Sequence, residues 1–502
     1  MKITIKNFGP IKEGKIENND LTIICGPNNS GKTYLTYLFY AIFSKISKNY
    51  SFNSQRIHRG HNLSILDIKN KDTYKSLTEI KLDIKTIADE YKENILPKLI
   101  QEAKDELPNF LNMEKELLSD AIIDVDFTKK ELLEKFENKN TEDRRLGLIN
   151  DLDIKIEQIS KYKSHLTMNP LDLDRIPDKL FKVVMKNFIF DYIYENIYSS
   201  AFLIPSIREG ISIYYNELNY LRTINSNIFR DLYRENKNQN IDTKLYDPSL
   251  RYNYPKPIED YYNFLLSLTN NQKPNDLFKD LAEELLNILE GNFSKDNTGF
   301  YYTPKNTNIK LSLSNSSSMV KSLFGLYYYL LYYAKKGDIV LIDEPGMNLH
   351  PDNQRRLAQF FAKMINSGLK VIISTHSDFI VREINNLMLL SQDFKGKEEI
   401  IKEHNYSEDM ILDYKKVNSY FINNGKIEKL AFDKLNGLDL KNFKDSINKI
   451  QDISDDIYFS ITESEDENIW RAKNIHHMTF TNISWITLIR NFNFKKTKNM
   501  KH

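Results

Sequence analysis

The sequence is poor in several features that usually mark particular classes of protein. Its one cysteine, Cys25, excludes an internal disulfide and suits a reducing compartment such as the cytoplasm. The 16 glycines and 14 prolines among 502 residues are too few for a largely disordered chain. The longest apolar run, Leu323–Ala334, is shorter than the roughly 20 residues that a membrane-spanning helix needs. We therefore expect a cytoplasmic protein with no membrane partner.

An excess of charge of one sign is also absent. Lysine and arginine number 70, aspartate and glutamate number 69, and the net charge is +1. This balance gives no global attraction to nucleic acid or to acidic membranes, although it leaves room for a local basic face. Hydrophobic residues make up 41% of the chain, which is enough for large cores. The length suggests roughly two to four domains.

The clearest motif lies near the N-terminus. Gly26-Pro-Asn-Asn-Ser-Gly-Lys-Thr33 fits the phosphate-loop pattern, with a buried strand expected at Leu21–Cys25 and a helix at Thr33–Lys45. Glycines let the backbone curl so that N–H groups face a phosphate, and the helix N-terminus attracts the same anion. Lys32 is placed to reach the β- and γ-phosphates of ATP, and Thr33 to hold Mg²⁺. The expected nucleotide contacts are Gly26, Asn28, Asn29, Ser30, Gly31, Lys32 and Thr33.

Two later strands end in residues suited to ATP hydrolysis. Asp338-Ile-Val-Leu-Ile-Asp-Glu-Pro345 is an apolar strand that ends in two adjacent carboxylates. We expect Asp343 to hold Mg²⁺ and Glu344 to act as general base toward the attacking water. After the next strand, Val371–Ser374, His376 is placed to sense the γ-phosphate. The candidate catalytic residues are Lys32, Glu344 and His376.

A serine-rich turn, Ser314-Asn-Ser-Ser-Ser318, precedes a helix expected over Met319–Ala334. Hydroxyls beside the free N–H groups of a helix N-terminus form an anion site, although the same pattern is also an ordinary helix cap. The turn stands just before the Asp343 strand, where a second phosphate-contacting loop would be supplied across a dimer. We expect these contacts from Ser316, Ser317 and Ser318.

The alternation of helix and strand between Met319 and Leu390 predicts a parallel sheet, and hence an α/β fold. Patterns over Leu77–Ala103, Met113–Ile122 and Lys129–Phe136 predict helices interrupted by proline. Three strand-like runs follow between 293 and 313. The expected segments are an N-terminal head lobe at 1–60, a helical insertion at 61–195, a head strand at 196–210, a second helical insertion at 211–290, a C-terminal head lobe at 291–395, an α/β region at 396–465 and a basic tail at 466–502.

These elements, in this order, resemble the ABC-type ATPase heads of the SMC, RecF and OLD-like group. The resemblance is carried by Ile5-Lys-Asn-Phe-Gly-Pro-Ile11, by Asp343-Glu-Pro-Gly-Met-Asn-Leu-His-Pro351 and by Ser374-Thr-His-Ser377. It is nearest to the OLD-like ATPases of bacterial anti-phage defence loci, of the PARIS and Septu types. It implies a P-loop ATPase head with a mixed sheet and large helical insertions.

The resemblance also implies roles for individual residues. Asn348–His350 takes the place of the D-loop and His376 that of the switch histidine, while Ser316–Lys321 stands at the signature motif without its usual Leu-Ser-Gly-Gly-Gln. Arg208, in Pro205-Ser-Ile-Arg208, stands where a Q-loop glutamine is usual and is expected to contact nucleotide, metal or a partner head. Heads of this group dimerise with ATP sandwiched between them, so a homodimer or higher homo-oligomer is implied.

Three functions fit these features. In the first, the chain is the sensor or regulatory ATPase of an anti-phage defence system, which responds to a phage protein or nucleic acid and gates a separate effector such as a nuclease. The second is a DNA-repair or DNA-clamp ATPase of the RecF or SMC kind, against which the proline-broken insertions and the small net charge argue. The third is an ATPase fused to its own C-terminal nuclease or toxin.

The C-terminal segment bears on the third function. An OLD nuclease carries a Glu and an Asp-x-Asp pair for Mg²⁺ after the switch histidine, yet the acidic cluster after His376, at Asp452–Asp456, lacks that spacing. We therefore predict no nuclease activity for the purified chain. A basic stretch after Glu467 contains Trp470 and Trp485 and is interpreted either as a solvated tail or as a nucleic-acid contact.

Overall fold

The computed structural model describes residues 1–46, 79–83, 91–128, 144–147, 153–160, 163–168, 200–215, 254–268, 272–296, 299–440 and 449–458, with a few single positions between them. The chain divides into a large unit, Met1–Leu438, and a second unit from Asp439 onward. The described part of the second unit is mainly a short helical stretch at 449–458. In these described ranges, no helix has the length and apolar character needed to cross a membrane.

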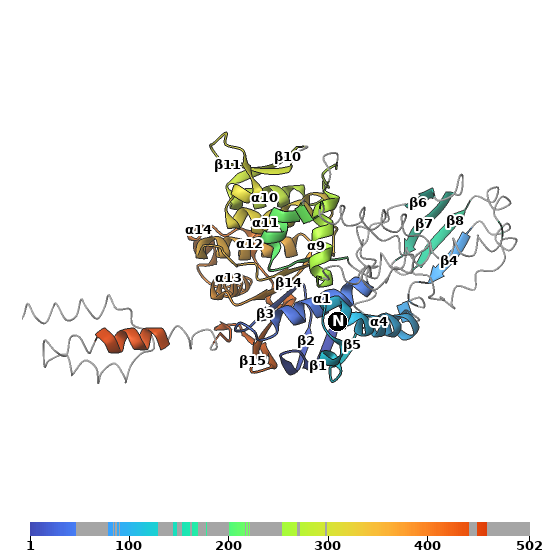
Figure 1. Cartoon of the computed structure of the whole chain (residues 1–502), viewed down its shortest axis with the longest axis horizontal. Coiled ribbons are helices and arrows are strands. Elements are labelled where there is room, and N and C mark those ends of the chain that lie inside the picture. Colours follow the sequence, from blue (N-terminus) through green and yellow to red (C-terminus); the bar gives the residue numbers. More distant parts are fainter. Residues whose placement is uncertain are drawn as a thin grey trace, which may run out of the picture. The chain divides into compact units, whose positions relative to one another are not determined.

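The large unit is built on a mixed sheet of nine described strands (Figure 1). Across the sheet the strands are β5 (Ile122–Asp126), β1 (Lys2–Phe8), β2 (Ile11–Glu17), β16 (Lys426–Leu430), β15 (Val417–Asn423), β3 (Leu21–Cys25), β14 (Lys370–Thr375), β13 (Ile339–Asp343) and β9 (Ala201–Ile204). The last five strands in this order, from β15 to β9, run parallel to one another. By contrast, β1 pairs antiparallel with both β5 and β2, and β15 pairs antiparallel with β16.

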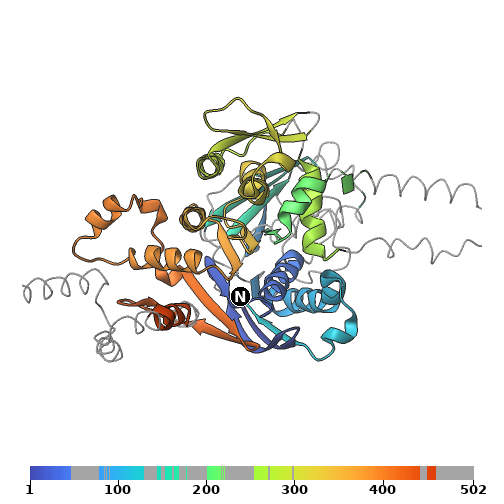
Figure 2. The same ribbon diagram turned by 60° about the vertical axis from the view of Figure 1, so that its left-hand side comes forward.

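Helices cover both faces of the parallel strands, which explains why these strands are continuous apolar runs. Leu341 and Ile372 pack in one core cluster with α1 and α4, which lie side by side along the sheet (Figure 2). On the edge strand, Phe202 stacks on Tyr329 of α11 at 4.0 Å and meets Phe264 of α9 at 4.7 Å. The helices are α1 (Lys32–Ile46), α4 (Leu96–Leu111), α9 (Lys256–Ser267), α10 (Lys279–Leu289), α11 (Ser318–Tyr332), α12 (Pro351–Asn366), α13 (Asp378–Leu389) and α14 (Lys397–Glu403).

Three smaller sheets accompany the large one. The expected strand-like runs between 293 and 313 are confirmed as an antiparallel sheet. A four-stranded antiparallel sheet and a two-stranded one are further elements of the described residues. Their strands are β10 (Gly291–Asp296), β11 (Gly299–Pro304) and β12 (Leu311–Ser312); β4 (Glu79–Asp83), β8 (Lys163–Met168), β7 (Asp153–Ser160) and β6 (Arg144–Gly147); and β17 (Phe432–Asp433) and β18 (Gly437–Leu438).

The helices expected over Leu77–Ala103 and Met113–Ile122 are wrong in part. Strand β4 occupies Glu79–Asp83, whose residues alternate between charged and apolar with the period of a strand. The expected interruption by proline is also wrong for α4, because Pro97 lies in its first turn, where proline is tolerated, and Pro108 lies within it. Strand β5 pairs with β1, so the predicted helical insertion contributes a strand to the head. The helix expected over Lys129–Phe136 lies outside the described residues.

Of the α/β region expected at 396–465, residues 396–438 belong to the large unit, whereas residues from 439 onward fall in the second unit. Strand β15 pairs in parallel with β3, next to the phosphate loop, and β16 pairs in parallel with β2. Cys25, at the end of β3, is buried as expected, and burial raises the pKa of its thiol. The basic tail at 466–502 lies outside the described residues, so both interpretations of it stay predictions.

Candidate nucleotide-binding and catalytic site

The predicted phosphate loop connects the end of β3 to the start of α1. Gly26 and Gly31 have φ angles of 152° and 103°, which side chains with a Cβ rarely adopt. A Cβ on Gly26 would also lie 2.6 Å from the carbonyl oxygen of Ile422 on β15. Asn28 and Asn29 are exposed on the loop. Glycine at position 26 is therefore required both by the backbone conformation and by the close approach of a neighbouring strand.

Ser30 and Lys32 place polar groups in this loop. Ser30 Oγ is buried without a hydrogen-bond partner in the described part of the chain, a deficit that a phosphate oxygen would satisfy. Lys32 Nζ donates to the carbonyl oxygens of Gly26 and Pro27, each at 3.0 Å. The same ammonium forms an ion pair with Glu344 Oε1 at 3.3 Å. Three oxygen atoms of the chain thus hold the Lys32 ammonium at the phosphate loop.

Asp343 ends β13 beside the first turn of α1. Its carboxylate accepts hydrogen bonds from Thr33 Oγ1, at 3.0 and 3.2 Å, and from Ser374 Oγ on β14. Burial raises the pKa of Asp343, and the hydrogen bonds from Ser374 and Thr33 oppose that shift. A buried carboxylate held by hydroxyl groups suits a divalent cation as a further partner. Sequence reasoning missed Ser374, although a serine that ends the apolar strand next to Asp343 was a usable signal.

Glu344 and His376 face each other across the ends of β13 and β14. Glu344 Oε2 lies 2.8 Å from His376 Nδ1 and accepts the His376 backbone N–H at 3.3 Å. The Glu344 backbone N–H donates to the Ser374 carbonyl oxygen at 3.0 Å. Together with the Lys32 ion pair, these contacts bring the three predicted catalytic side chains into one cluster.

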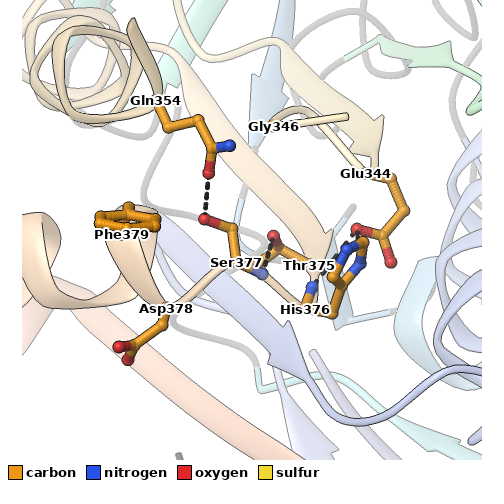
Figure 3. Close-up of a pocket in the computed structure, with 8 residues that line it drawn as sticks. All are labelled: Glu344, Gly346, Gln354, Thr375, His376, Ser377, Asp378 and Phe379. Atoms are coloured by element: carbon orange, nitrogen blue, oxygen red, sulfur yellow. Dashed lines mark hydrogen bonds and ion pairs between the residues drawn. The ribbon is translucent and has the colours of Figure 1, made fainter. Parts of the chain in front are cut away.

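A cavity of about 250 Å³ lies beside this cluster. Figure 3 shows Glu344 and His376 close together on one side of it and Gln354 above Ser377 on the other. Gln354 Oε1 accepts a hydrogen bond from Ser377 Oγ, and its Nε2 donates to the Leu349 carbonyl oxygen at 2.8 Å. Gln354, which sequence reasoning did not single out, therefore links the predicted D-loop to the segment that carries His376.

The serine-rich turn has a local structural role. Ser317 is the N-cap of α11 and its Oγ accepts the Val320 N–H at 3.4 Å, while Ser316 Oγ donates to the Ser312 carbonyl oxygen at 2.9 Å. Ser318 is the first residue of the helix. These bonds match the ordinary helix cap that the pattern allowed. The contact of Ser316, Ser317 and Ser318 with nucleotide on a second copy stays a prediction.

Arg208 has a different place from the one expected. Its side chain is 1% exposed, and Nη1 and Nη2 donate to the carbonyl oxygens of Asp343 and Glu344 at 2.8 and 2.9 Å. In this structure the guanidinium therefore supports the backbone at the end of β13. The expectation that Arg208 contacts nucleotide, metal or a partner head is wrong here, because burial leaves the guanidinium no surface to offer them.

Comparison with solved structures finds similarity to SMC head domains. The SmcHead bound to the C-winged helix domain of ScpA is 10% identical, with a TM-score of 0.33 and coverage of 86% of this chain and 96% of that one. The SMC head domain from Thermotoga maritima is 11% identical, with a TM-score of 0.28 and coverage of 86% and 98%. The Smc head domain with an extended coiled coil, from Pyrococcus furiosus, is 13% identical, with a TM-score of 0.31 and coverage of 90% and 98%.

Comparison with protein families gives the assignment. No curated protein matches the chain. The model of the AAA ATPase domain matches residues 1–381, which include the phosphate loop, both carboxylates of the β13 end and His376. The mixed sheet, the loop between β3 and α1 and the acidic end of β13 agree with an α/β P-loop ATPase. The chain therefore belongs to the AAA ATPase domain family.

Proposed function

We propose that this chain hydrolyses ATP with Mg²⁺ as an ABC-type head, and that a second copy of the chain completes the site. The observation that carries the proposal is the cluster of Lys32, Glu344 and His376 beside the hydrogen-bonded Thr33 and Asp343. An ammonium balances phosphate charge, a carboxylate takes a proton from water, and an imidazole orients that carboxylate.

The residues of the site fit both ATP and Mg²⁺. The Thr33 hydroxyl and the buried Asp343 carboxylate are hard oxygen ligands of the kind that Mg²⁺ prefers, and they would hold the ion. Ser30 Oγ, which has no hydrogen-bond partner among the described residues, and the glycine backbone at Gly26 and Gly31 suit phosphate oxygens. When bound, Mg²⁺ would neutralise charge that develops on the phosphates.

Glu344 becomes available as a base when Lys32 turns away from it. In the structure, Glu344 Oε1 pairs with Lys32 and Oε2 with His376. A triphosphate competes for Lys32 because it carries more negative charge than a single carboxylate. Once Lys32 is drawn to the phosphates, Oε1 is free to accept a proton from water, while His376 keeps the carboxylate oriented through Oε2.

The proposed second copy rests on the resemblance of Asn348–His350 to a D-loop. Asn348 and His350 are exposed, whereas Leu349 between them is buried. The loop is therefore anchored by its apolar residue and presents its two polar residues outward, as a contact with a partner head requires. Gln354 ties the same loop to the segment of His376, so a partner bound there would be sensed at the catalytic cluster.

As the wider role, we propose regulation of anti-phage defence, in which a phage protein or nucleic acid triggers the ATP cycle and the cycle gates a separate effector such as a nuclease. The run Asn348-Leu-His-Pro351 after the two carboxylates supports this proposal. The neighbouring genes test it. An adjacent nuclease gene would support defence, whereas adjacent recombination genes would favour a DNA-repair ATPase.

Phosphate release from ATP by the purified full chain tests the activity itself. We expect turnover that requires Mg²⁺ and rises more steeply than linearly with protein concentration, because two copies share each site. Lys32→Met should abolish ATP binding, since it removes the loop cation, whereas Lys429→Met, at an exposed position on β16, should change neither binding nor turnover. Absence of turnover in the wild type at every protein concentration would overturn the proposed activity.

A further inference from the structure

Arg208 supports the end of the catalytic strand through three consecutive carbonyl groups. Nη1 donates to the Asp343 oxygen at 2.8 Å, and Nη2 donates to the oxygens of Glu344 at 2.9 Å and Pro345 at 3.4 Å. Asp343 is the last residue of β13, and Glu344 and Pro345 follow it; the Glu344 carbonyl also accepts the Met347 N–H at 3.2 Å. The planar fork of an arginine, with donors in fixed directions, fits such a row of acceptors in a way that a lysine ammonium does not.

The other donors of Arg208 reach two further elements. Nε donates to Ser322, at 2.7 Å to Oγ and 3.1 Å to the carbonyl oxygen, and Nη1 donates to the Pro205 oxygen at 3.2 Å. Ser322 lies in α11, just after the serine-rich turn that begins this helix. One buried guanidinium thus joins the loop after β9, the first turns of α11 and the backbone of Asp343 and Glu344.

The backbone of Glu344 needs such support. Its φ angle is 50°, in the left-handed region that residues with a Cβ adopt only where the surroundings impose it. The surroundings hold it from both sides, because the Glu344 N–H donates to the Ser374 oxygen and the Glu344 carbonyl accepts from Arg208. This conformation directs the Glu344 carboxylate toward Lys32 and His376.

The positive charge of the Arg208 guanidinium is costly to bury. Burial lowers the pKa of the Arg208 guanidinium, while the negative groups around it, including Asp343 and Glu344, act in the opposite direction. A neutral apolar residue would fill the same space without that cost. The guanidinium is therefore better explained by the positions of its acceptors than by filling of the core.

We propose that Arg208 is a positioning residue for ATP hydrolysis. It holds the Glu344 backbone in its left-handed conformation and connects the N-terminal turns of α11 to the orientation of the Glu344 carboxylate. This inference rests on the proposed ATPase function. Arg208 acts through Glu344 and touches no nucleotide. Movement of the serine-rich turn by a partner head would reach Glu344 through Ser322 and Arg208.

The test separates positioning from folding. Arg208→Lys keeps a positive charge but loses the fork, so we expect kcat to fall roughly 10- to 100-fold while the Kd for ATP is no weaker than that of the wild type, because the phosphate loop is untouched. Ser322→Ala, which removes one acceptor, should lower kcat by a smaller factor. The matched control is Arg355→Lys, whose arginine pairs with the buried Glu383 away from the cluster and should leave kcat unchanged.

A double-mutant cycle gives the decisive readout. If Arg208 acts through Glu344, adding Arg208→Lys to Glu344→Gln should not lower the residual turnover further. An equal loss in both backgrounds, or a wild-type kcat in Arg208→Lys, would overturn the inference while leaving the ATPase function intact. If Arg208→Lys fails to fold, an unaltered kcat in Ser322→Ala overturns it instead. No turnover in the wild type would overturn the ATPase function, and this inference with it.

Discussion

Glu344→Gln is the substitution that most directly tests how the cluster works. Glu344 forms an ion pair with the Lys32 ammonium that ATP needs, and the side chain of Glu344 is 14% exposed against 6% for Lys32. The amide of glutamine keeps the size of the side chain but removes its charge. We expect the variant to bind ATP more tightly than the wild type and to hydrolyse it much more slowly.

The structure sets the size of both effects. Two unit charges 3.3 Å apart attract by about 5 kcal/mol at an effective dielectric constant of 20, and the net contribution of a charge-assisted hydrogen bond is about 1.5–3 kcal/mol. Because each 1.4 kcal/mol is tenfold in affinity, release of Lys32 should tighten the Kd for ATP roughly 10- to 150-fold. Loss of the base should lower kcat by about 10²- to 10⁴-fold.

Titration of ATP binding by calorimetry and phosphate release measure the two effects on the same samples. Size-exclusion chromatography with ATP should also show Glu344→Gln held as a closed oligomer, because hydrolysis no longer separates the copies. The matched control is Glu13→Gln. Glu13 forms an ion pair with Lys426 at the same distance, 3.3 Å, but both side chains are more than half exposed.

Two results would refute the reasoning. An unchanged Kd in Glu344→Gln would mean that the ion pair does not hold Lys32 back from ATP. An unchanged kcat would remove Glu344 as the base. A tighter Kd in Glu13→Gln would show that the gain comes from a general loss of negative charge and not from the release of Lys32.

Two further predictions concern stability. Burial raises the pKa of Asp343, so the folded chain binds a proton on this carboxyl more tightly than the unfolded chain and loses stability as the pH rises above the ordinary aspartate value of 3.8. Asp343→Asn should therefore raise the melting temperature measured at pH 7 without nucleotide, and it should remove the stabilisation by Mg²⁺ and ATP. A melting temperature below that of the wild type would contradict this prediction. In Gly14→Ala, the new Cβ would lie 2.4 Å from Ile427 Cβ on β16, so the free energy of unfolding should fall by about 1–3 kcal/mol in chemical denaturation. Gly210→Ala, where the new Cβ meets no atom within 4 Å, should not lower the free energy of unfolding. An unchanged denaturation midpoint in Gly14→Ala would mean that β16 does not pack on β2.

Local patterns were sufficient for the parts of the site that are continuous in sequence. The phosphate loop, the apolar strands before Asp343 and His376 and the helix after the serine-rich turn each carry their own signal, because glycine placement, apolar runs and capping residues act over a few positions. The sequence alone therefore predicted the side chains of Lys32, Glu344 and His376 that the structure brings together. The short strands β4 and β5 were missed because alternation over five residues is weak beside the helical spacing around it.

Tertiary structure decided how these parts are held. Pairing of β15 with β3 joins residues about 400 positions apart, and no local pattern specifies which distant strand becomes a neighbour. The place of Arg208 at the Q-loop position suggested a contact with a ligand. Its hydrogen bonds to the backbone depend on burial and on acceptors from α11 and β13, which the sequence does not specify. The charge of an arginine is a property of the sequence, but whether that charge faces a nucleotide or the backbone is settled only when distant elements pack around it.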